Sequence, residues 1–316
     1  MSGEHPVAAL LRARATGTRD DGARLVLAIE GGGMRGAVSA GMAIAIHELG
    51  LTGCFDAVYG ASAGALNAVW LLSGNPGEGL RPYADPALMR AYIRRSNVLR
   101  GRPVVDTRHL VEHLYEHVLP LRFERVIEHP VRLHPLATDV ETGRAVDLAD
   151  TIRDRASLKL ALRASTALPV LAGPPVEIAG RRYLDAGLAE SIPFHAALAA
   201  GATHVLVLRS RRPQDAERPS GASRALTSAL LRRLGEPVRR GYLDRAERLA
   251  EDDALLDRHG ADGALEPTLL AIRPPEDSPR VSRLESDPGV VRAGLDAGRE
   301  AALAVLPGDQ TGSRLA

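Results

Sequence analysis

The sequence predicts an α/β fold of three layers, α/β/α, in which helices cover both faces of a mainly parallel central sheet. Two strand–turn–helix units indicate this fold. In the first, the apolar run Leu25 to Ile29 breaks into glycines and is followed by a helical pattern over 37–49. In the second, the short run 57–59 leads through a glycine turn at 60–64 into an apolar, helix-prone segment. Short apolar runs of this kind are typical of buried parallel strands.

The two glycine turns are expected at the same edge of the sheet. A right-handed crossover returns the chain in the same direction, so both turns follow the carboxyl ends of neighbouring strands. The first turn, 31–36, supplies a run of backbone amides. The second, 60–64, has the G-x-S-x-G spacing of a nucleophile elbow, in which Ser62 sits on a tight turn between strand and helix. Together they predict an acyl-transfer site, with a serine nucleophile beside N–H donors for an oxyanion.

The rest of the chain continues the α/β pattern. Further strands are expected at 131–137, 144–148, 176–178, 182–184, 204–208 and 269–272. Further helices are expected at 86–95, 107–117, 157–165, from 193 onward, at 225–256 with a weak point at 235–237, and at 290–306. Ala179-Gly180 predicts a hairpin turn. We expect residues 1–22 to be a loose N-terminal tail and residues 23–310 to form a single domain.

The composition excludes several classes of protein. The 316 residues are 45% hydrophobic and 25% charged, as in an ordinary globular protein, and the net charge of +1 gives no footprint for nucleic acid. The single cysteine, Cys54, excludes an intrachain disulfide and is expected to be buried. Residues 1–22 lack a signal peptide's long apolar core, and no stretch reaches the roughly 18 apolar residues of a membrane span. We therefore expect a cytoplasmic location.

Two other interpretations of the glycine-rich turn fail on the sequence. The turn 31–36 also fits G-x-G-x-x-G, but a dinucleotide site requires an acidic residue at the end of the second strand. Asp56 has about the right spacing but precedes that strand. A phosphate-binding loop would require Gly-Lys-Ser/Thr, which is absent.

The serine needs a base, and the residues alone leave its identity open. Asp185 ends the strand at 182–184, immediately before Ala186-Gly187, although an aspartate there is more commonly an ordinary turn residue. His47 lies on the first crossover helix, too far from the turn to serve as the base. The other histidines considered have no distinctive setting: His195, His204 and His259.

Three motifs, in this order, resemble those of the patatin-like phospholipases. The family's G-G-G-x-R/K-G matches 31–36, its G-x-S-x-G matches 60–64 and its D-G/A-G matches 185–187. Softer matches lie at 137–143 and 164–169. The resemblance covers about 25–208, so 209–310 is expected to be a family-variable part. The chain departs from many relatives at Ser191-Ile192-Pro193, where Asn-x-Pro is common, and at Val170-Leu171, where an aromatic residue is common.

The resemblance implies a patatin-like fold and a lipid acyl-ester hydrolase that works through a serine–aspartate dyad, without a metal ion or a cofactor. Ser62 would be the nucleophile and Asp185 the base. The oxyanion hole would be built from the turn Gly31, Gly32, Gly33, Met34, Arg35 and Gly36, and the elbow from Gly60, Ala61, Ala63 and Gly64. The Arg35 side chain is expected to fix the loop by pairing with a carboxylate, rather than to meet an anionic head group.

The expected partner is an acyl-lipid or other acyl ester with an apolar tail, as for a phospholipase A, a lysophospholipase or an esterase. The helical segments 86–117 and 225–256 either line its pocket or pack on the sheet. Arginine runs like that of the second segment usually form a solvated face, and the alternative is peripheral contact with a membrane. These arginines are Arg232, Arg233, Arg239, Arg240, Arg245 and Arg248. Acyl transfer by the same dyad, or lipid binding without catalysis, are the alternative functions.

Overall fold

The sheet of the computed structural model runs in the order β5-β6-β3-β2-β1-β7-β8, with β4 paired to β3. Strands β3, β2, β1, β7 and β8 are parallel, whereas β4 and β6 run antiparallel to β3. The strands are β1 (Leu25–Ile29), β2 (Ala57–Ala61), β3 (Arg132–Asp139), β4 (Ala145–Asp147), β5 (Val176–Ile178), β6 (Arg181–Asp185), β7 (His204–Leu208) and β8 (Thr268–Ile272). The structure describes residues 4–19, 21–93, 97, 103–169, 171–215 and 221–307. The expected mainly parallel sheet is confirmed.

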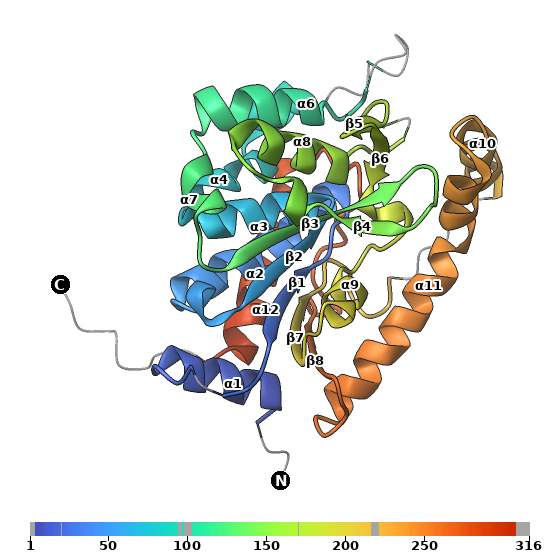
Figure 1. Ribbon diagram of the computed structural model, residues 1–316. Helices are drawn as coiled ribbons and strands as arrows, with labels where there is room; N and C mark the ends of the chain where they lie inside the picture. Colours follow the sequence, from blue (N-terminus) through green and yellow to red (C-terminus); the bar gives the residue numbers. More distant parts are fainter. Residues whose placement is uncertain are drawn as a thin grey trace.

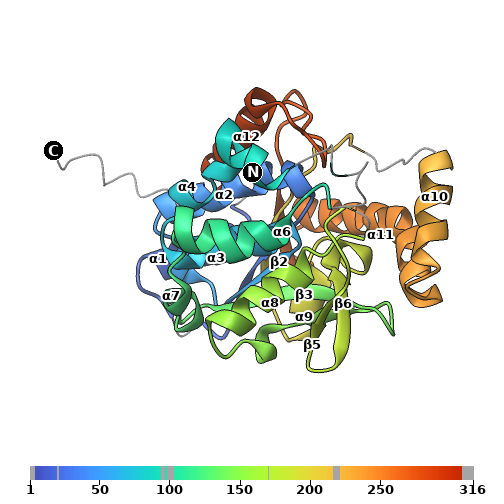
Figure 2. The same ribbon diagram turned by 90° about the horizontal axis from the view of Figure 1, so that it is seen from above.

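Helices cover both faces of the sheet (Figures 1 and 2). They are α1 (Pro6–Ala15), α2 (Gly36–Glu48), α3 (Ala63–Ser73), α4 (Pro76–Gly79), α5 (Pro86–Tyr92), α6 (Thr107–His109), α7 (Phe123–Ile127), α8 (Arg155–Ser165), α9 (Phe194–Ala199), α10 (Gly221–Leu231), α11 (Glu236–Ala261) and α12 (Pro288–Val305). A π-helix, Leu110–Val118, continues α6. Short 3₁₀ turns lie at Gly33–Arg35 and Ala186–Leu188.

Alternating side chains of β1 divide the core into two layers. Leu25, Leu27 and Ile29 belong to the cluster shared with α2, α3 and α12. Val26 and Ala28 belong to the cluster shared with α9 and α11. Because successive side chains of a strand point to opposite faces, one strand contributes to both layers. This arrangement confirms the predicted three-layer α/β/α architecture.

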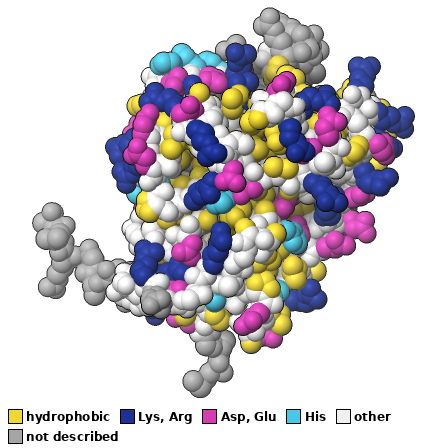
Figure 3. Space-filling model, in the orientation of Figure 1, with side chains coloured by type: hydrophobic (Ala, Val, Ile, Leu, Met, Phe, Trp, Pro, Cys, Tyr) yellow, Lys and Arg dark blue, Asp and Glu magenta, His cyan; other side chains and the backbone are white. Residues whose placement is uncertain are grey.

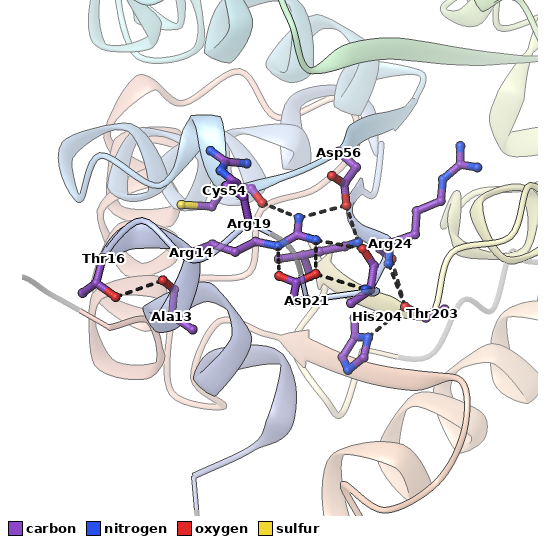
Figure 4. A network of polar contacts seen from close by, with 12 residues as sticks. Ala13, Arg14, Thr16, Arg19, Asp21, Arg24, Cys54, Asp56, Thr203 and His204 are labelled. Atoms are coloured by element: carbon purple, nitrogen blue, oxygen red, sulfur yellow. Dashed lines mark hydrogen bonds and ion pairs between the residues drawn. The ribbon is translucent and has the colours of Figure 1, made fainter.

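The N-terminal segment is not the loose tail that the sequence suggested. Residues 6–15 form α1, with Val7 and Leu11 fully buried. Arg14, also buried, donates hydrogen bonds to Asp21, to Asp56 and to the carbonyl oxygens of Cys54 and Ala23 (Figure 4). The two carboxylates raise the pKa of the Arg14 guanidinium, so its charge is retained. The helix is therefore tied to the turns that precede β1 and β2.

Most other elements lie where the sequence placed them. The segment 225–256 breaks at its predicted weak point into α10 and α11, Ala179 and Gly180 form the β5–β6 turn with positive φ, and Cys54 is buried. The predicted end of the 86–95 helix, Val170 and residues 308–310 lie outside the described residues. Within the described part of the chain, no helix has the length and apolar character needed to cross a membrane.

Candidate active site

Ser62 stands on a strained turn between β2 and α3. Its φ of 55° and ψ of −123° lie in a region that non-glycine residues rarely adopt. The flanking glycines permit this turn, because a Cβ on Gly60 would lie 2.5 Å from Ala65 Cα. A Cβ on Gly64 would overlap the Ile29 carbonyl oxygen of the neighbouring strand. The G-x-S-x-G segment thus has the geometry of a nucleophile elbow.

The Ser62 hydroxyl donates a hydrogen bond to Asp185: the distance from Oγ to Oδ2 is 2.6 Å. Asp185 ends β6, which pairs antiparallel with β3 so that Ala137 lies opposite Asp185. Since β3 is also the parallel neighbour of β2, this pairing brings the aspartate beside the elbow. The two residues that the sequence analysis placed in the dyad are therefore in direct contact.

The Asp185 carboxylate is buried, with only 4% of the residue exposed. Its Oδ1 accepts the Gly187 amide at 2.8 Å, and its backbone carbonyl accepts the Thr138 hydroxyl at 2.8 Å. Burial raises the pKa of Asp185 above the ordinary value for an aspartate, although Ser62, the Gly187 amide and two nearby arginines oppose the shift. A buried carboxyl that accepts the hydroxyl proton of a serine in a hydrogen bond is placed to act as a general base.

The glycine-rich turn passes directly over the elbow. A Cβ on Gly31 would overlap Ala61 O and lie 2.9 Å from Ser62 Cβ. Gly32 and Gly33 have φ of 149° and 60°, which favour glycine. Only glycine therefore allows this backbone to approach Ser62 so closely.

Two of the six residues predicted to form the oxyanion hole use their amides elsewhere. Met34 N–H donates to Arg283 O at 3.0 Å, and Gly36 N–H donates to the carbonyl oxygens of Gly33 and Met34. Those two amides are not free for a substrate, which corrects the broader expectation. Within the described chain, the amides of Gly31, Gly32 and Gly33 donate no hydrogen bond to protein atoms and remain the candidates.

Buried polar contacts hold the glycine-rich turn against the residues that follow β7. Glu30 is paired with Arg209 at 2.9 Å and accepts the Ser210 amide at 2.8 Å. The Ser210 hydroxyl donates to Gly31 O at 2.8 Å and accepts from Arg35 Nε at 3.2 Å. Arg35 also lies near enough to Glu30 to help lower the pKa of that carboxylate. The contact with Ser210 supports a loop-fixing role for Arg35, whereas its pairing with a carboxylate stays a prediction.

A largely apolar cavity of about 140 Å³ opens at Ser62 and Asp185. The glycine turn and the dyad form one end of it. Both segments proposed from the sequence contribute to its lining: Tyr92, Leu110 and Tyr115 come from the first, and Tyr242 and Arg245 from the second. A cavity of this character fits an apolar chain whose ester group lies at the polar end.

The histidines stand apart from this cavity, since none of them lines it. His195 Nε2 instead lies 2.7 Å from Asp252 Oδ1, beside Glu190, whose burial raises its pKa to about 7. His259 is buried near the N-terminal helix and contacts His5 through its carbonyl oxygen. Among the described residues that line the cavity there is thus no histidine.

Two arginines of the predicted solvated face belong to the site instead. Arg232, Arg233 and Arg240 are exposed. Basic side chains gather at the edge formed by α10 and the start of α11 (Figure 3). Arg245 and Arg248, however, contact the turn that follows Asp185. Helical spacing distinguishes these two from their solvated neighbours. Arg245 lies four residues before the buried Leu249, and Arg248 lies four residues before the buried Asp252.

The motif order and this geometry agree with a family match. The model of the patatin-like phospholipases matches residues 27–198, more than half of the chain. The chain belongs to the patatin-like phospholipase family. The residues of the glycine turn, the elbow and the Asp-Ala-Gly turn of this family member all lie within the match.

Two individual proteins are similar to this patatin-like chain. The uncharacterised protein YjjU of Escherichia coli (strain K12) is 26% identical over 202 residues, which cover 59% of this chain and 52% of YjjU. The chain therefore spans about half the length of that relative. Among solved structures, VipD from Legionella pneumophila is similar with a TM-score of 0.47 and 15% identity, over 90% of this chain and 66% of VipD.

Proposed function

We propose that the protein is a lipid acyl-ester hydrolase with Ser62 as nucleophile and Asp185 as general base. The observation that carries the proposal is the 2.6 Å hydrogen bond from the Ser62 hydroxyl to the buried Asp185 carboxylate, at the polar end of an apolar cavity. The family match supports an activity on lipid esters in general.

The first half of the reaction forms an acyl-enzyme. Ser62 Oγ attacks the ester carbonyl carbon while its proton passes to Asp185, and the amides of Gly31 to Gly33 bind the oxyanion. When the tetrahedral intermediate collapses, the bond to the alkoxy oxygen breaks and Asp185 returns the proton to the departing alcohol.

The second half releases the acid. Water attacks the acyl-Ser62 ester and gives a proton to Asp185, and the same amides bind the second oxyanion. Collapse of this intermediate frees the fatty acid, and the proton returns to Ser62 Oγ. Atoms and charges balance without a metal ion or a redox cofactor.

We also propose that residues 23–310 act as one catalytic domain. Strands β7 and β8 extend the same sheet, and α11 lines the cavity with Tyr242 and Arg245, although these elements follow the family-matched segment. Their contribution to the cavity supports a single unit.

A fluorophosphonate probe tests the nucleophile. The probe should label the wild-type protein on the peptide that contains Ser62, as located by mass spectrometry, and a medium-chain p-nitrophenyl ester should be hydrolysed. Ser62→Ala should abolish both signals, whereas Ser73→Ala, on the same helix but outside the cavity, should keep both. A labelled protein without hydrolysis would favour acyl transfer to another acceptor, and absence of both signals would favour lipid binding alone.

A further inference from the structure

Helix α11 contacts the turn after Asp185, although it lies outside the residues that match the family model. Arg245 Nε donates to Gly187 O at 2.5 Å, and Arg248 Nη2 donates to Leu188 O at 2.6 Å. In the same turn, the backbone amide of Gly187 donates a hydrogen bond to Asp185 Oδ1 at 2.8 Å. The turn 186–188 is thus held between the carboxylate and two guanidinium groups.

The helix packs against this turn at backbone distance. A Cβ on Gly241 would lie 3.2 Å from Leu188 O, so a larger side chain would push the helix and the turn apart. Arg248 also donates to Gly241 O at 2.8 Å, which ties its guanidinium to the helix itself. Arg245 is only 9% exposed. These contacts describe a built interface rather than a chance approach of two surface residues.

Arg245 of α11 also interacts electrostatically with the Asp185 carboxylate. The groups that favour its ionised form are the Ser62 hydroxyl, the Gly187 amide, Arg283 from the segment between β8 and α12, and Arg245. They oppose burial, which raises the pKa of the carboxylate. Arg245 therefore acts on Asp185 in two ways. It holds the turn whose amide donates to the carboxylate, and its positive charge favours the ionised form.

We propose that Arg245 is a positioning residue for the hydrolysis, which fixes the Gly187 carbonyl and thereby the orientation of Asp185 toward Ser62. Arg248 supports the same turn one residue further on. The proposal rests on the function proposed above. It assigns to α11, a part of the chain without a family match, the task of holding the base in place.

Substitutions at Arg245 separate positioning from substrate binding. Arg245→Met should lower kcat about 10- to 100-fold, because small displacements of catalytic groups cost rates of this order. KM should change little. The acid limb of kcat/KM should move to higher pH, because a nearby positive charge that favours the carboxylate is lost. Arg245→Lys keeps the charge and one donor, so it should restore part of kcat and most of the pH profile.

The matched control is Arg240→Met, on the same helix but exposed, which should leave kcat, KM and the pH profile unchanged. Circular dichroism and thermal melting report whether each variant is folded. If Arg245→Met does not fold, Arg245→Lys and Arg248→Met still test the proposal, since both should lower kcat with little change in KM.

Three results would overturn the proposal: wild-type kcat and pH profile in folded Arg245→Met, an increase in KM alone, or an Arg245→Lys variant no better than Arg245→Met. An increase in KM alone would place Arg245 in substrate binding. Failure of the proposed function is distinguishable, because the wild-type protein itself would then neither hydrolyse the ester nor react with the fluorophosphonate.

Discussion

The backbone amide of Ser62 donates a hydrogen bond to the hydroxyl of Ser165, with a distance of 3.0 Å from N to Oγ. Ser165 is the last residue of α8, so this bond joins that helix to the strained elbow. Ser165 is fully buried. The nucleophile's own N–H is thus occupied by a side chain, so this amide is directed away from the role of oxyanion donor. The contact also holds the elbow in its unfavourable backbone conformation.

Removing this hydrogen bond should lower the reactivity of Ser62 more than the stability of the fold. In Ser165→Ala the partly buried Ser62 amide loses its acceptor, which costs about 1–3 kcal/mol. We expect the rate of fluorophosphonate labelling to fall about tenfold, in line with a loss of roughly 1.4 kcal/mol, and the melting temperature to fall by a few degrees. Labelling at the wild-type rate would show that the elbow does not need Ser165.

The close approach of the glycine turn to the elbow predicts a severe effect of Gly31→Ala. Its Cβ would overlap Ala61 O, so the turn would have to move away from Ser62. Loss of an oxyanion donor typically costs about 10²–10³ in kcat, and we expect a fall of this size. Gly260→Ala is the control, because a Cβ there meets nothing within 4 Å on helix α11 and alanine favours helix. Equal activity of the two variants would contradict this account of the turn.

Removal of the buried ion pair between Glu30 and Arg209 should lower the stability of the fold. Arg209 is fully buried between Glu30 and Asp253. Arg209→Met removes the nearer partner of Glu30 and leaves it the more distant Arg211. Removal of one partner of a buried ion pair costs about 3–5 kcal/mol. We expect a decrease near the lower figure in the free energy of unfolding, measured with urea. The double variant Glu30→Gln/Arg209→Met should lose less than the two single losses combined, and simple additivity would count against the pair.

The same pair sets a pH dependence of stability. Burial opposes ionisation of Glu30, but Arg209, Arg211 and Arg35 together lower its pKa well below the ordinary glutamate value. Because the pKa of Glu30 is lower in the folded state, its ionised form stabilises the fold at pH values above the unfolded pKa of about 4.3. This stabilisation is lost progressively as the pH falls below that value toward the folded-state pKa. The wild-type protein should therefore lose more stability on acidification than Glu30→Gln, as measured by urea unfolding at several pH values.

The cavity lining predicts a change in chain-length preference. Leu171 lines the cavity and is only partly buried, so a larger ring is accommodated with little strain. Leu171→Trp should shorten the space for the acyl chain and lower kcat/KM for a p-nitrophenyl decanoate at least about tenfold relative to the butyrate, since one methylene in an apolar pocket is already worth about 1–3 kcal/mol. An unchanged ratio would place the acyl chain elsewhere.

Local sequence signals predicted much of the fold and the centre of the site. Glycine turns after apolar runs are short-range features, so the elbow at Ser62 and the turn 31–36 were found directly. Asp185 was identified through the resemblance of its Asp-Ala-Gly turn. Strand β7 appears with the bounds that its apolar run predicted.

Other features depend on contacts distant in sequence. Helix α1 is short, and its stability depends on burial of Val7 and Leu11 and on the contacts of Arg14, which the local sequence does not show. The π-helix 110–118 requires i→i+5 hydrogen bonds that tertiary packing selects. The approach of Arg245 to Gly187 joins residues 58 positions apart. An arginine run alone does not reveal which members turn inward.

The dyad is tested most directly by kcat/KM for a medium-chain p-nitrophenyl ester in the wild-type protein, Ser62→Ala and Asp185→Asn. We predict turnover by the wild-type protein and a loss of at least about 10³-fold in both variants, with circular dichroism unchanged, because nucleophile and base act as a unit. Asp185→Asn with most of the wild-type activity would contradict the account and require another base for Ser62.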